Sequence, residues 1–458
     1  MTYQYTYPPS FKKYVEKHAN GLPEATLPFQ VLGWKTMDLS TRLEIIFCGI
    51  FLLIPRLVIY LIAMLFLQIF ARAGCIGLDF SKNADKPDAR GLRKIFLYPA
   101  MICFRVQYLC MGVHWIGVKG EPADFKKAPI RIAAPHSSML DTSIMCAFPF
   151  TNLTSPVASS FLMQILPMRI LEPLILTRES RQSRKSVIQA LEKRVVNHDK
   201  KNSHDWYPIL VFPEGTCWNR TAICNIKTSA FKPGVPVQPV YVEMSCDAFT
   251  TCDVTSFTWF SGKTGIPSNF LLTAIMPMLR LDNSLTVHYL PVHTPSTAEK
   301  SNSKLYATNV RKTISDYSKL PVLDICFEDG RLMSRFYEHY KGDPRHAFCQ
   351  VLRLFETYEM TYSEIELCFD DYMSTFASFV DNETGVLKMK FFENITDLDR
   401  KSCELFFGKN TRIEIKDAVE AYCKAKTQIR GFTDEEILEK FGETRKTLEK
   451  HPYLIMKG

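Results

Sequence analysis

The run Ile130-Arg131-Ile132-Ala133-Ala134 leads directly into Pro135-His136-Ser137-Ser138-Met139-Leu140-Asp141-Thr142-Ser143, and this junction decides the fold. An apolar, β-branched run that ends at a proline is typical of a buried strand followed by a turn. If a helical turn begins here, Asp141 lies about one turn beyond His136, where its carboxylate can accept the proton of one ring nitrogen. His136 and Asp141 are therefore candidates for a general base and its orienting acid.

A second strand-to-turn junction follows downstream. The run Pro208-Ile209-Leu210-Val211-Phe212 ends in Pro213-Glu214-Gly215-Thr216. Gly215 allows close approach of a ligand to the backbone, and Glu214 can bind substrate hydroxyl groups or support the turn. We predict that Glu214, Gly215 and Thr216 bind the acceptor substrate.

A third junction, Leu174-Ile175-Leu176-Thr177-Arg178, places an arginine at the end of a strand. A guanidinium matches a phosphate group through two parallel hydrogen bonds, which lysine cannot form. Arg178 is the predicted phosphate anchor. Three further cations, Arg181, Arg184 and Lys185, fall near one face of a predicted helix over 181–197, where solvation explains them more simply than ligand binding.

Short β-branched runs alternate with helical patterns from residue 113 to residue 290. This alternation predicts an α/β domain with a mixed sheet flanked by helices and with its motifs at strand ends. The predicted strands are 113–118, 130–134, 172–176, 208–212, 237–242 and 285–290.

The N-terminal part contains an apolar segment that follows a polar stretch over 1–41. From Ile45 to Ala71 the only charged side chain is Arg56, preceded by Pro55. A membrane span needs about 20 apolar residues, and an arginine in the membrane interior costs roughly 2.5–3.5 kcal/mol on insertion scales. A re-entrant hairpin broken at Pro55-Arg56 therefore competes with one kinked transmembrane helix, and we favour the hairpin. The mixed stretch 96–118 predicts a helix packed on the membrane, followed by the first strand.

Charge and cysteine content exclude several classes of protein. The net charge is +8. Residues 1–319 hold 36 basic and 22 acidic side chains, whereas residues 320–458 hold 20 basic and 26 acidic side chains. The basic part suits phosphate-bearing ligands or anionic lipid, but no nucleic-acid motif is present. The 14 cysteines include no C-x-x-C pair, so we expect reduced thiols facing the cytosol and no metal centre.

The segment 321–458 is acidic and predominantly helical in pattern. One predicted helix, over 433–441, begins with the capping box Thr433-x-x-Glu436. Residues 379–391 resemble a calcium-binding loop, with Gly385 at the turn position, but Val380 and Phe391 occupy the first and twelfth ligand positions. Because both carboxylates are missing, we expect a degenerate, structural EF-hand-like region that does not bind calcium.

The junctions together resemble the four sequence blocks of the glycerolipid acyltransferase superfamily. The longer runs Phe212–Thr221, Phe231–Val240 and Leu290–Ser296 are similar to its lysophosphatidylcholine acyltransferase branch. The resemblance, over roughly residues 40–315, implies transfer of an acyl chain from acyl-CoA to the free hydroxyl of a lysophospholipid at the endoplasmic reticulum membrane, with the catalytic domain facing the cytosol. By position it makes His136 and Asp141 the catalytic pair, Arg178 the phosphate-binding arginine, and Glu214 and Gly215 the acceptor-binding turn. Trp218 departs from the branch, which has a smaller polar residue there.

These expectations divide the chain into a polar segment 1–41, membrane-associated helices 42–118, an acyltransferase domain 119–320 and a helical, EF-hand-like domain 321–458. The expected partners are acyl-CoA as co-substrate, a lysophospholipid, most plausibly lysophosphatidylcholine, and the bilayer, with no cofactor, metal or nucleic acid. Two alternatives stay open: an enzyme that acylates lysophosphatidic acid or glycerol 3-phosphate, and an inactive lipid-binding scaffold. A serine lipase is disfavoured because no G-x-S-x-G elbow occurs.

Overall fold

The computed structural model forms two compact units, residues 25–260 with 267–327, and residues 1–24 with 261–266 and 328–458. It describes residues 38–77, 91–137, 139–146, 153–159, 171–176, 181–196, 198–199, 206–215, 217–218, 220, 222–244, 275, 277–323, 386–388, 401, 412–414, 420, 424, 427–429, 431–450 and 454–455.

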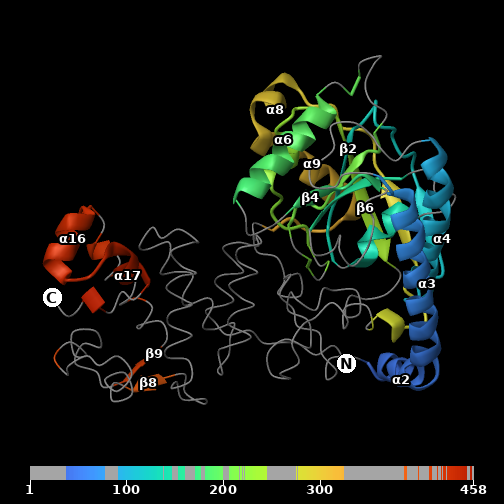
Figure 1. Cartoon of the computed structure of the whole chain (residues 1–458), viewed down its shortest axis with the longest axis horizontal. Helices are drawn as coiled ribbons and strands as arrows, with labels where there is room; N and C mark the ends of the chain where they lie inside the picture. The colour runs from blue at the N-terminus through green and yellow to red at the C-terminus, as the bar shows by residue number, and fades with distance from the viewer. Residues whose placement is uncertain are drawn as a thin grey trace. The chain divides into compact units, whose positions relative to one another are not determined.

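A mixed seven-stranded sheet is the centre of the larger unit (Figure 1). Its strand order is β1-β7-β6-β2-β5-β3-β4, and every neighbouring pair is parallel except β6 and β7. The strands are β1 (Ile116–Lys119), β2 (Ile130–Ala133), β3 (Ser155–Ser159), β4 (Leu174–Leu176), β5 (Ile209–Val211), β6 (Val237–Met244) and β7 (Leu285–Tyr289). The predicted mixed α/β sheet is confirmed.

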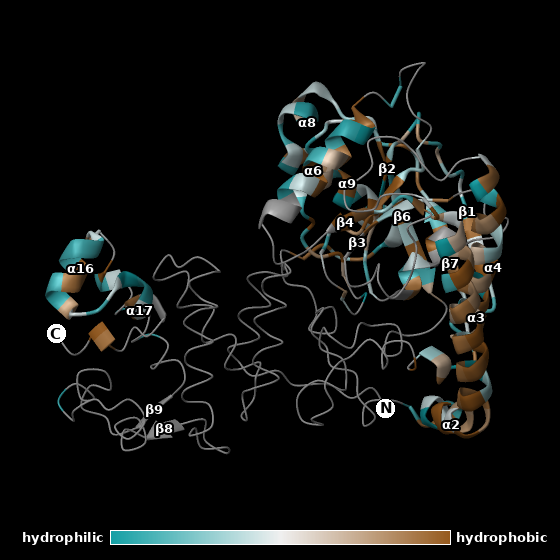
Figure 2. Ribbon diagram, in the orientation of Figure 1, coloured by the Kyte–Doolittle hydropathy of each residue, from teal (hydrophilic) through white to brown (hydrophobic). Residues whose placement is uncertain are grey.

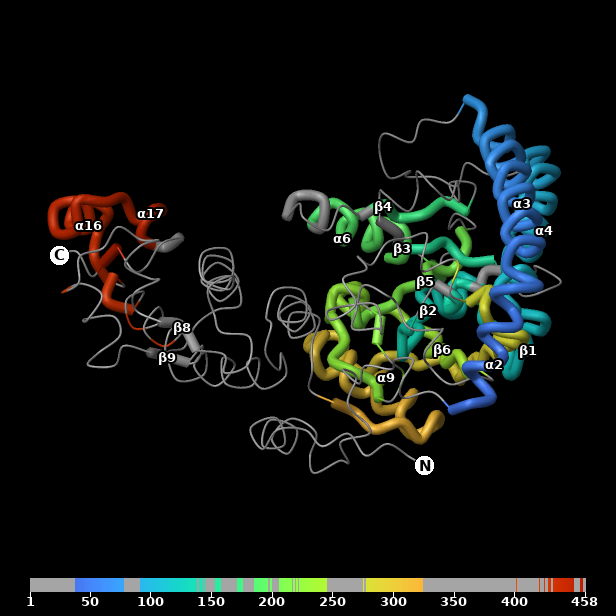
Figure 3. The backbone as a smooth tube through the Cα atoms, turned by 90° about the horizontal axis from the view of Figure 1, so that it is seen from below, coloured from blue at the N-terminus to red at the C-terminus, as the bar shows by residue number. Residues whose placement is uncertain are grey.

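Helices cover both faces of this sheet, so it forms the middle of three layers (Figures 1 and 3). On one face α6 (Arg181–Val195) and α9 (Ser303–Ser318) share a hydrophobic cluster with Ile130, Ile132 and Val237. On the other face α3 (Leu53–Gly74) and α4 (Lys94–Cys110) pack with Ala133 and Val240. Both faces of β2 are buried, including the face that carries Arg131, so the strand does not alternate between buried and exposed residues.

The apolar N-terminal segment is one continuous helical rod. It comprises α2 (Leu39–Phe47), a π-helical turn (Cys48–Leu52) and α3. It is long and apolar enough to cross a membrane: its most apolar 18 residues have a mean hydropathy of 2.6, and only 17% of this stretch is buried in the protein. Figure 2 shows α3 as a mainly hydrophobic ribbon, whereas α2 is mixed.

The favoured hairpin break at Pro55-Arg56 is wrong for this structure, because the helix continues through both residues. The π turn ends immediately before α3, so the proline lies in the first turn of the new helix, where its missing N–H is tolerated. The Arg56 guanidinium donates to the carbonyls of Met278 (2.7 Å), Arg280 (2.5 Å) and Leu281 (3.5 Å). Protein carbonyls, rather than lipid or a chain break, therefore accommodate its charge.

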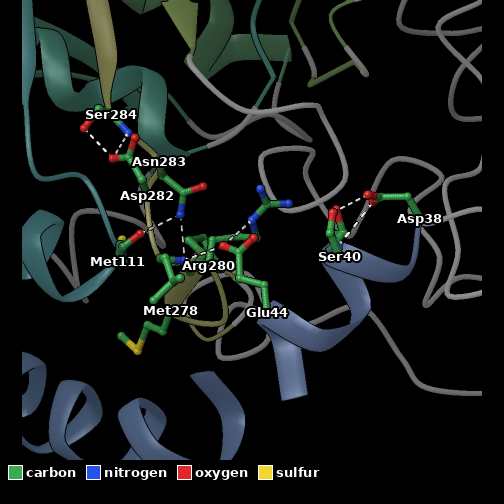
Figure 4. A network of polar contacts seen from close by, with 12 residues as sticks. Asp38, Ser40, Glu44, Met111, Met278, Arg280, Asp282, Asn283 and Ser284 are labelled. Atoms are coloured by element: carbon green, nitrogen blue, oxygen red, sulfur yellow. Dashed lines mark hydrogen bonds and ion pairs between the residues drawn. The ribbon is translucent and has the colours of Figure 1, made fainter. Parts of the chain in front are cut away.

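A polar network ties the same rod to the segment that precedes β7 (Figure 4). Glu44 of α2 accepts hydrogen bonds from Arg280 Nε (3.0 Å) and from the Leu281 backbone N–H (2.7 Å). The buried Asn283 side chain donates to the Met111 carbonyl at 2.7 Å. The rod is thus joined to the sheet by polar contacts as well as by apolar packing.

Helix α4 lies alongside α3 (Figures 1 and 3) and also contacts the helix η5 (Met139–Cys146), which carries part of the first motif. Its buried Tyr108 hydroxyl is 2.5 Å from the Thr142 hydroxyl, next to Asp141. The segment 42–118, expected as a separate membrane region, therefore lies in the same compact unit as the sheet.

The smaller unit is described only in part. Strands β8 (Val386–Lys388) and β9 (Arg412–Glu414) pair antiparallel, with Leu387 opposite Ile413. Helix α16 (Asp434–Phe441) begins at the predicted capping box, in which Thr433 and Glu436 bond reciprocally, and α17 (Arg445–Lys450) follows. Within the predicted loop 379–391 only β8 is described, so the EF-hand-like character stays a prediction.

Candidate active site

His136 follows the end of β2 and is bonded to Asp141, as its spacing indicates. The Nδ1 atom of His136 is 2.9 Å from Oδ2 of Asp141, which lies in the 3-10 helix η5 (Met139–Cys146). The histidine side chain is 17% exposed, and that of the aspartate is fully buried. Because the Asp141 carboxylate accepts a hydrogen bond from the Nδ1–H group, the Nε2 atom keeps its lone pair and can accept a proton from a substrate.

The Asp141 carboxylate is held ionised by several donors. Its Oδ2 atom also accepts the Ser137 backbone N–H at 2.6 Å, and Arg220 Nη1 lies 3.8 Å from Oδ1. Burial raises the pKa of this carboxyl. The hydrogen bond and charge of His136, the charge of Arg220 and the Ser137 N–H lower the pKa by more than burial raises it, so the net pKa is below its usual value. The acid is thus charged when the histidine is neutral.

The backbone of His136 is fixed by the second motif. Its N–H donates to Glu214 Oε2 at 2.6 Å, and its carbonyl accepts the Trp218 N–H at 2.7 Å. The imidazole stacks on the Phe212 ring with a centroid separation of 4.1 Å. The residues after β5 therefore position the histidine on both its main chain and its ring.

Glu214 lies beneath the site with no exposed surface, and both its oxygens are used. Oε1 accepts the Cys224 N–H at 2.8 Å, while Oε2 accepts from His136. Burial raises the pKa of this carboxyl to about 8, although the two N–H donors lower it. The structure therefore gives Glu214 the second of its two expected roles, support of the turn, rather than direct contact with an acceptor hydroxyl.

Gly215 has the left-handed backbone conformation that its turn requires, with φ of +77°. A Cβ atom at this position would lie 3.1 Å from Cε of Lys227, whose side chain crosses the turn. Glycine thus serves both the backbone conformation and the close approach of the lysine.

Two of the predicted site residues, Arg178 and Thr216, lie outside the described residues, so their roles stay predictions. Trp218, noted as a departure from the branch, has a fully buried side chain and contributes its backbone N–H to His136. Its bulk is therefore part of the core beside the site.

Sequence reasoning gave no role to Arg220, Ser137 or Phe212, although all three contact the His136–Asp141 pair. Phe212 and Arg220 belong to the run Phe212–Thr221 that carries the family resemblance, which was a signal that they are near the site.

A cavity of about 500 Å³ lies away from this site. It is lined by residues that include Lys119, Lys127, Gln238 and Tyr317. Gln238 pairs with Arg131 near the start of β2, whereas His136 follows the end of that strand. The Gln238 amide is already bonded to the main chain of Ala123, Glu121 and Leu290. The cavity therefore adds nothing to the reacting groups.

Comparisons with known proteins identify a family for the part of the chain that contains this site. Residues 118–243 match the Acyltransferase family. The chain is 31% identical to lysophosphatidylcholine acyltransferase of Drosophila melanogaster over 303 residues, and this aligned region covers 65% of this chain and 54% of that protein. It is 32% identical over 298 residues to lysophosphatidylcholine acyltransferase 1 of Danio rerio, covering 64% and 53% of the two chains.

The human lysophosphatidylcholine acyltransferase 2 is 31% identical over 298 residues, covering 64% of this chain and 51% of that protein. The crystal structure of the 1-acyl-sn-glycerophosphate acyltransferase PlsC from Thermotoga maritima aligns with 57% of this chain and 98% of its own, at 15% identity and a TM-score of 0.33. The chain spans about half the length of the curated relatives it matches. Residues 118–243 thus match the Acyltransferase family, and about two thirds of the chain is similar to lysophosphatidylcholine acyltransferases.

Proposed function

We propose that this protein transfers an acyl chain from acyl-CoA to the free hydroxyl of a lysophospholipid, with His136 as general base. The observation that carries the proposal is the 2.9 Å contact between His136 Nδ1 and the fully buried Asp141 carboxylate. This pair leaves one partly exposed ring nitrogen oriented to take a proton.

The reaction needs no acyl-enzyme. His136 Nε2 takes the proton of the acceptor hydroxyl as that oxygen attacks the thioester carbonyl, and Asp141 stabilises the resulting imidazolium. The tetrahedral intermediate then collapses as the C–S bond breaks, and the imidazolium returns the proton to the leaving sulfur. The products are a phospholipid and free CoA.

Lysophosphatidylcholine is the proposed acceptor, because relatives with that name match about two thirds of the chain. Arg178 would bind the phosphate of the acceptor, and Gly215 would let it approach the turn backbone. Lysophosphatidic acid and glycerol 3-phosphate contain the same phosphate and hydroxyl groups and are the competing acceptors.

The proposed location is the endoplasmic reticulum membrane, with the site on its cytosolic side. Apolar side chains at least half exposed on α2, the π-helical turn, α3 and α4 support contact with lipid, among them Leu39, Ile50, Phe51, Ile54, Val58, Leu61, Leu65, Ile95 and Ile102. Exposure on this scale is unfavourable in water and is expected for a surface that faces acyl chains.

The experiment is acyl transfer from radiolabelled oleoyl-CoA, catalysed by the full chain in microsomes, with the three acceptors compared separately. His136→Ala and Asp141→Ala are expected to lose at least about 1,000-fold in kcat/KM, as removal of a catalytic base or its partner does elsewhere. His198→Ala is the matched control, because its ring bonds to the Val195 carbonyl in another part of the domain. Full activity of His136→Ala would end the mechanism.

An inactive lipid-binding scaffold is the alternative from a different class. It predicts that purified wild-type protein binds vesicles but transfers no acyl chain to any acceptor. The intact His136–Asp141 hydrogen bond favours the enzyme.

A further inference from the structure

We infer that Arg220 is a positioning residue that sets the working pH of the His136–Asp141 pair by compensating the charge of the aspartate. The inference deepens the proposed function, because it assigns a new residue to the same site. It rests on the position of the guanidinium, which contacts three segments of the domain at once.

The first observation is which carboxylate oxygen each partner uses. His136 Nδ1 and the Ser137 N–H both bond to Oδ2 of Asp141, whereas Arg220 Nη1 lies 3.8 Å from Oδ1. The arginine therefore acts on the carboxylate without competing for the hydrogen bond that orients the imidazole.

The second observation is that the arginine is held in place. Its Nη1 also lies 3.5 Å from the Ser137 hydroxyl, and its Nη2 donates to the Val242 carbonyl of β6. Arg220 has a φ of +65°, a left-handed conformation that is uncommon for a residue with a side chain. Only 11% of the side chain is exposed. A fixed, shielded cation interacts with a buried carboxylate more strongly than a solvated one does.

The third observation is the local charge balance. Among the described residues, the titratable and charged groups around this carboxylate are His136 after β2, Glu214 after β5, Arg220 itself, Tyr241 of β6 and Tyr108 of α4. Arg220 is the permanent cation of this set. Without it, an uncompensated Asp141 would stabilise the protonated imidazole, and His136 would be unable to act as a base until a higher pH.

The test compares Arg220→Gln, Arg220→Met and Arg220→Lys with wild type, using the full chain in mixed micelles. The first readout is kcat/KM for acyl transfer to lysophosphatidylcholine between pH 5.5 and 9.5. The second is the pH dependence of His136 modification by diethyl pyrocarbonate, followed by mass spectrometry of its peptide, which requires no turnover. Two neutral variants are included in case one fails to fold.

In both neutral variants the acidic limb and the modification midpoint should move up by about 0.5–1 pH unit, so kcat/KM should fall by about 3- to 10-fold at pH values below both midpoints. Arg220→Lys should keep both midpoints near those of wild type. Arg194→Gln is the matched control: its guanidinium is also buried and bonds to the Glu172 carbonyl in another part of the sheet, so neither midpoint should move.

Unmoved midpoints in the neutral variants, or a shift as large in Arg220→Lys, would overturn the inference. Failure of the proposed function has a different signature. Wild-type protein would then be inactive toward every acceptor, while the modification midpoint would still shift in the neutral variants.

Discussion

Replacing Glu214 by glutamine tests how the second motif supports the first. The carboxyl group is fully buried and accepts two backbone N–H groups, one from His136 at 2.6 Å and one from Cys224 at 2.8 Å. Glutamine has the same shape but only one acceptor oxygen. One of the two N–H groups will therefore face an amide N–H₂ group, and a buried donor without an acceptor costs about 1–3 kcal/mol.

The cost also depends on pH, and the sign follows from the raised pKa. Burial raises the pKa of Glu214 from 4.5 to about 8, so between these values the folded state binds the proton that the unfolded state releases. The stabilisation linked to that proton is fully present below pH 4.5 and is lost as the pH rises through 8, by on the order of 4 kcal/mol. Glutamine does not titrate, so the stability of the Glu214→Gln variant does not fall in this way as the pH rises. The wild-type advantage should therefore be largest near pH 5 and should shrink or reverse near pH 8.

The assay is thermal unfolding of wild type and Glu214→Gln in the same micelles at pH 5, 6, 7 and 8. Tryptophan fluorescence reports the transition because Trp206 and Trp218 are buried. A difference of 1 kcal/mol corresponds to roughly 2–4 °C in Tm for a unit of this size. Asp316→Asn on the exposed surface is the control for removal of a carboxylate. A wild-type advantage that stays constant from pH 5 to pH 8 would refute the reasoning.

Three further substitutions test other contacts. Gly215→Ala should lower Tm and kcat/KM together for two reasons: the new Cβ would lie 3.1 Å from Lys227 Cε, and an alanine at φ +77° is strained by about 1–2 kcal/mol. The double variant Gly215→Ala with Lys227→Ala should recover only the part of the lost stability that is due to the contact with Lys227. Arg56→Met should make residues 277–281 sensitive to limited proteolysis, because three backbone carbonyls in this segment lose their charged donor. Arg72→Met, at the other end of α3, is the control and should leave the digestion pattern unchanged. Thr433→Ala should destabilise α16 by about 1 kcal/mol, measured by hydrogen exchange of its amides, whereas Thr433→Ser should be nearly neutral because it preserves the capping box.

Local sequence predicted much of the sheet because both of its faces are buried. Such strands are rich in apolar and β-branched residues, and β2, β5, β6 and β7 lie in runs of this kind even though β2 contains Arg131 and β6 contains Gln238. Strand β3 was missed because Ser155-Pro156-Val157-Ala158-Ser159 has two serines and a proline, which resemble a loop. Its position between β4 and β5 depends on partners distant in the sequence.

The His136–Asp141 contact was predictable because five positions separate the residues within one turn. The burial of Glu214 and the position of Arg220 were not, because each depends on a long-range contact. Continuity of the rod at Arg56 was missed for the same reason: its acceptors lie more than 220 positions further along the chain. Local propensity alone favoured a break there.

The apolar pair α3 and α4 has a practical consequence for dissecting the protein. Residues 118–243, the region matched by the family, include neither α4 nor β7, yet the core on one side of the sheet contains Phe104, Tyr108 and Val287. A soluble fragment cut at the start of that region would expose this side of the sheet to water and leave Thr142, beside Asp141, without its Tyr108 partner. Removal of the apolar helices, a routine route to soluble protein, would therefore remove contacts that hold the candidate active site together.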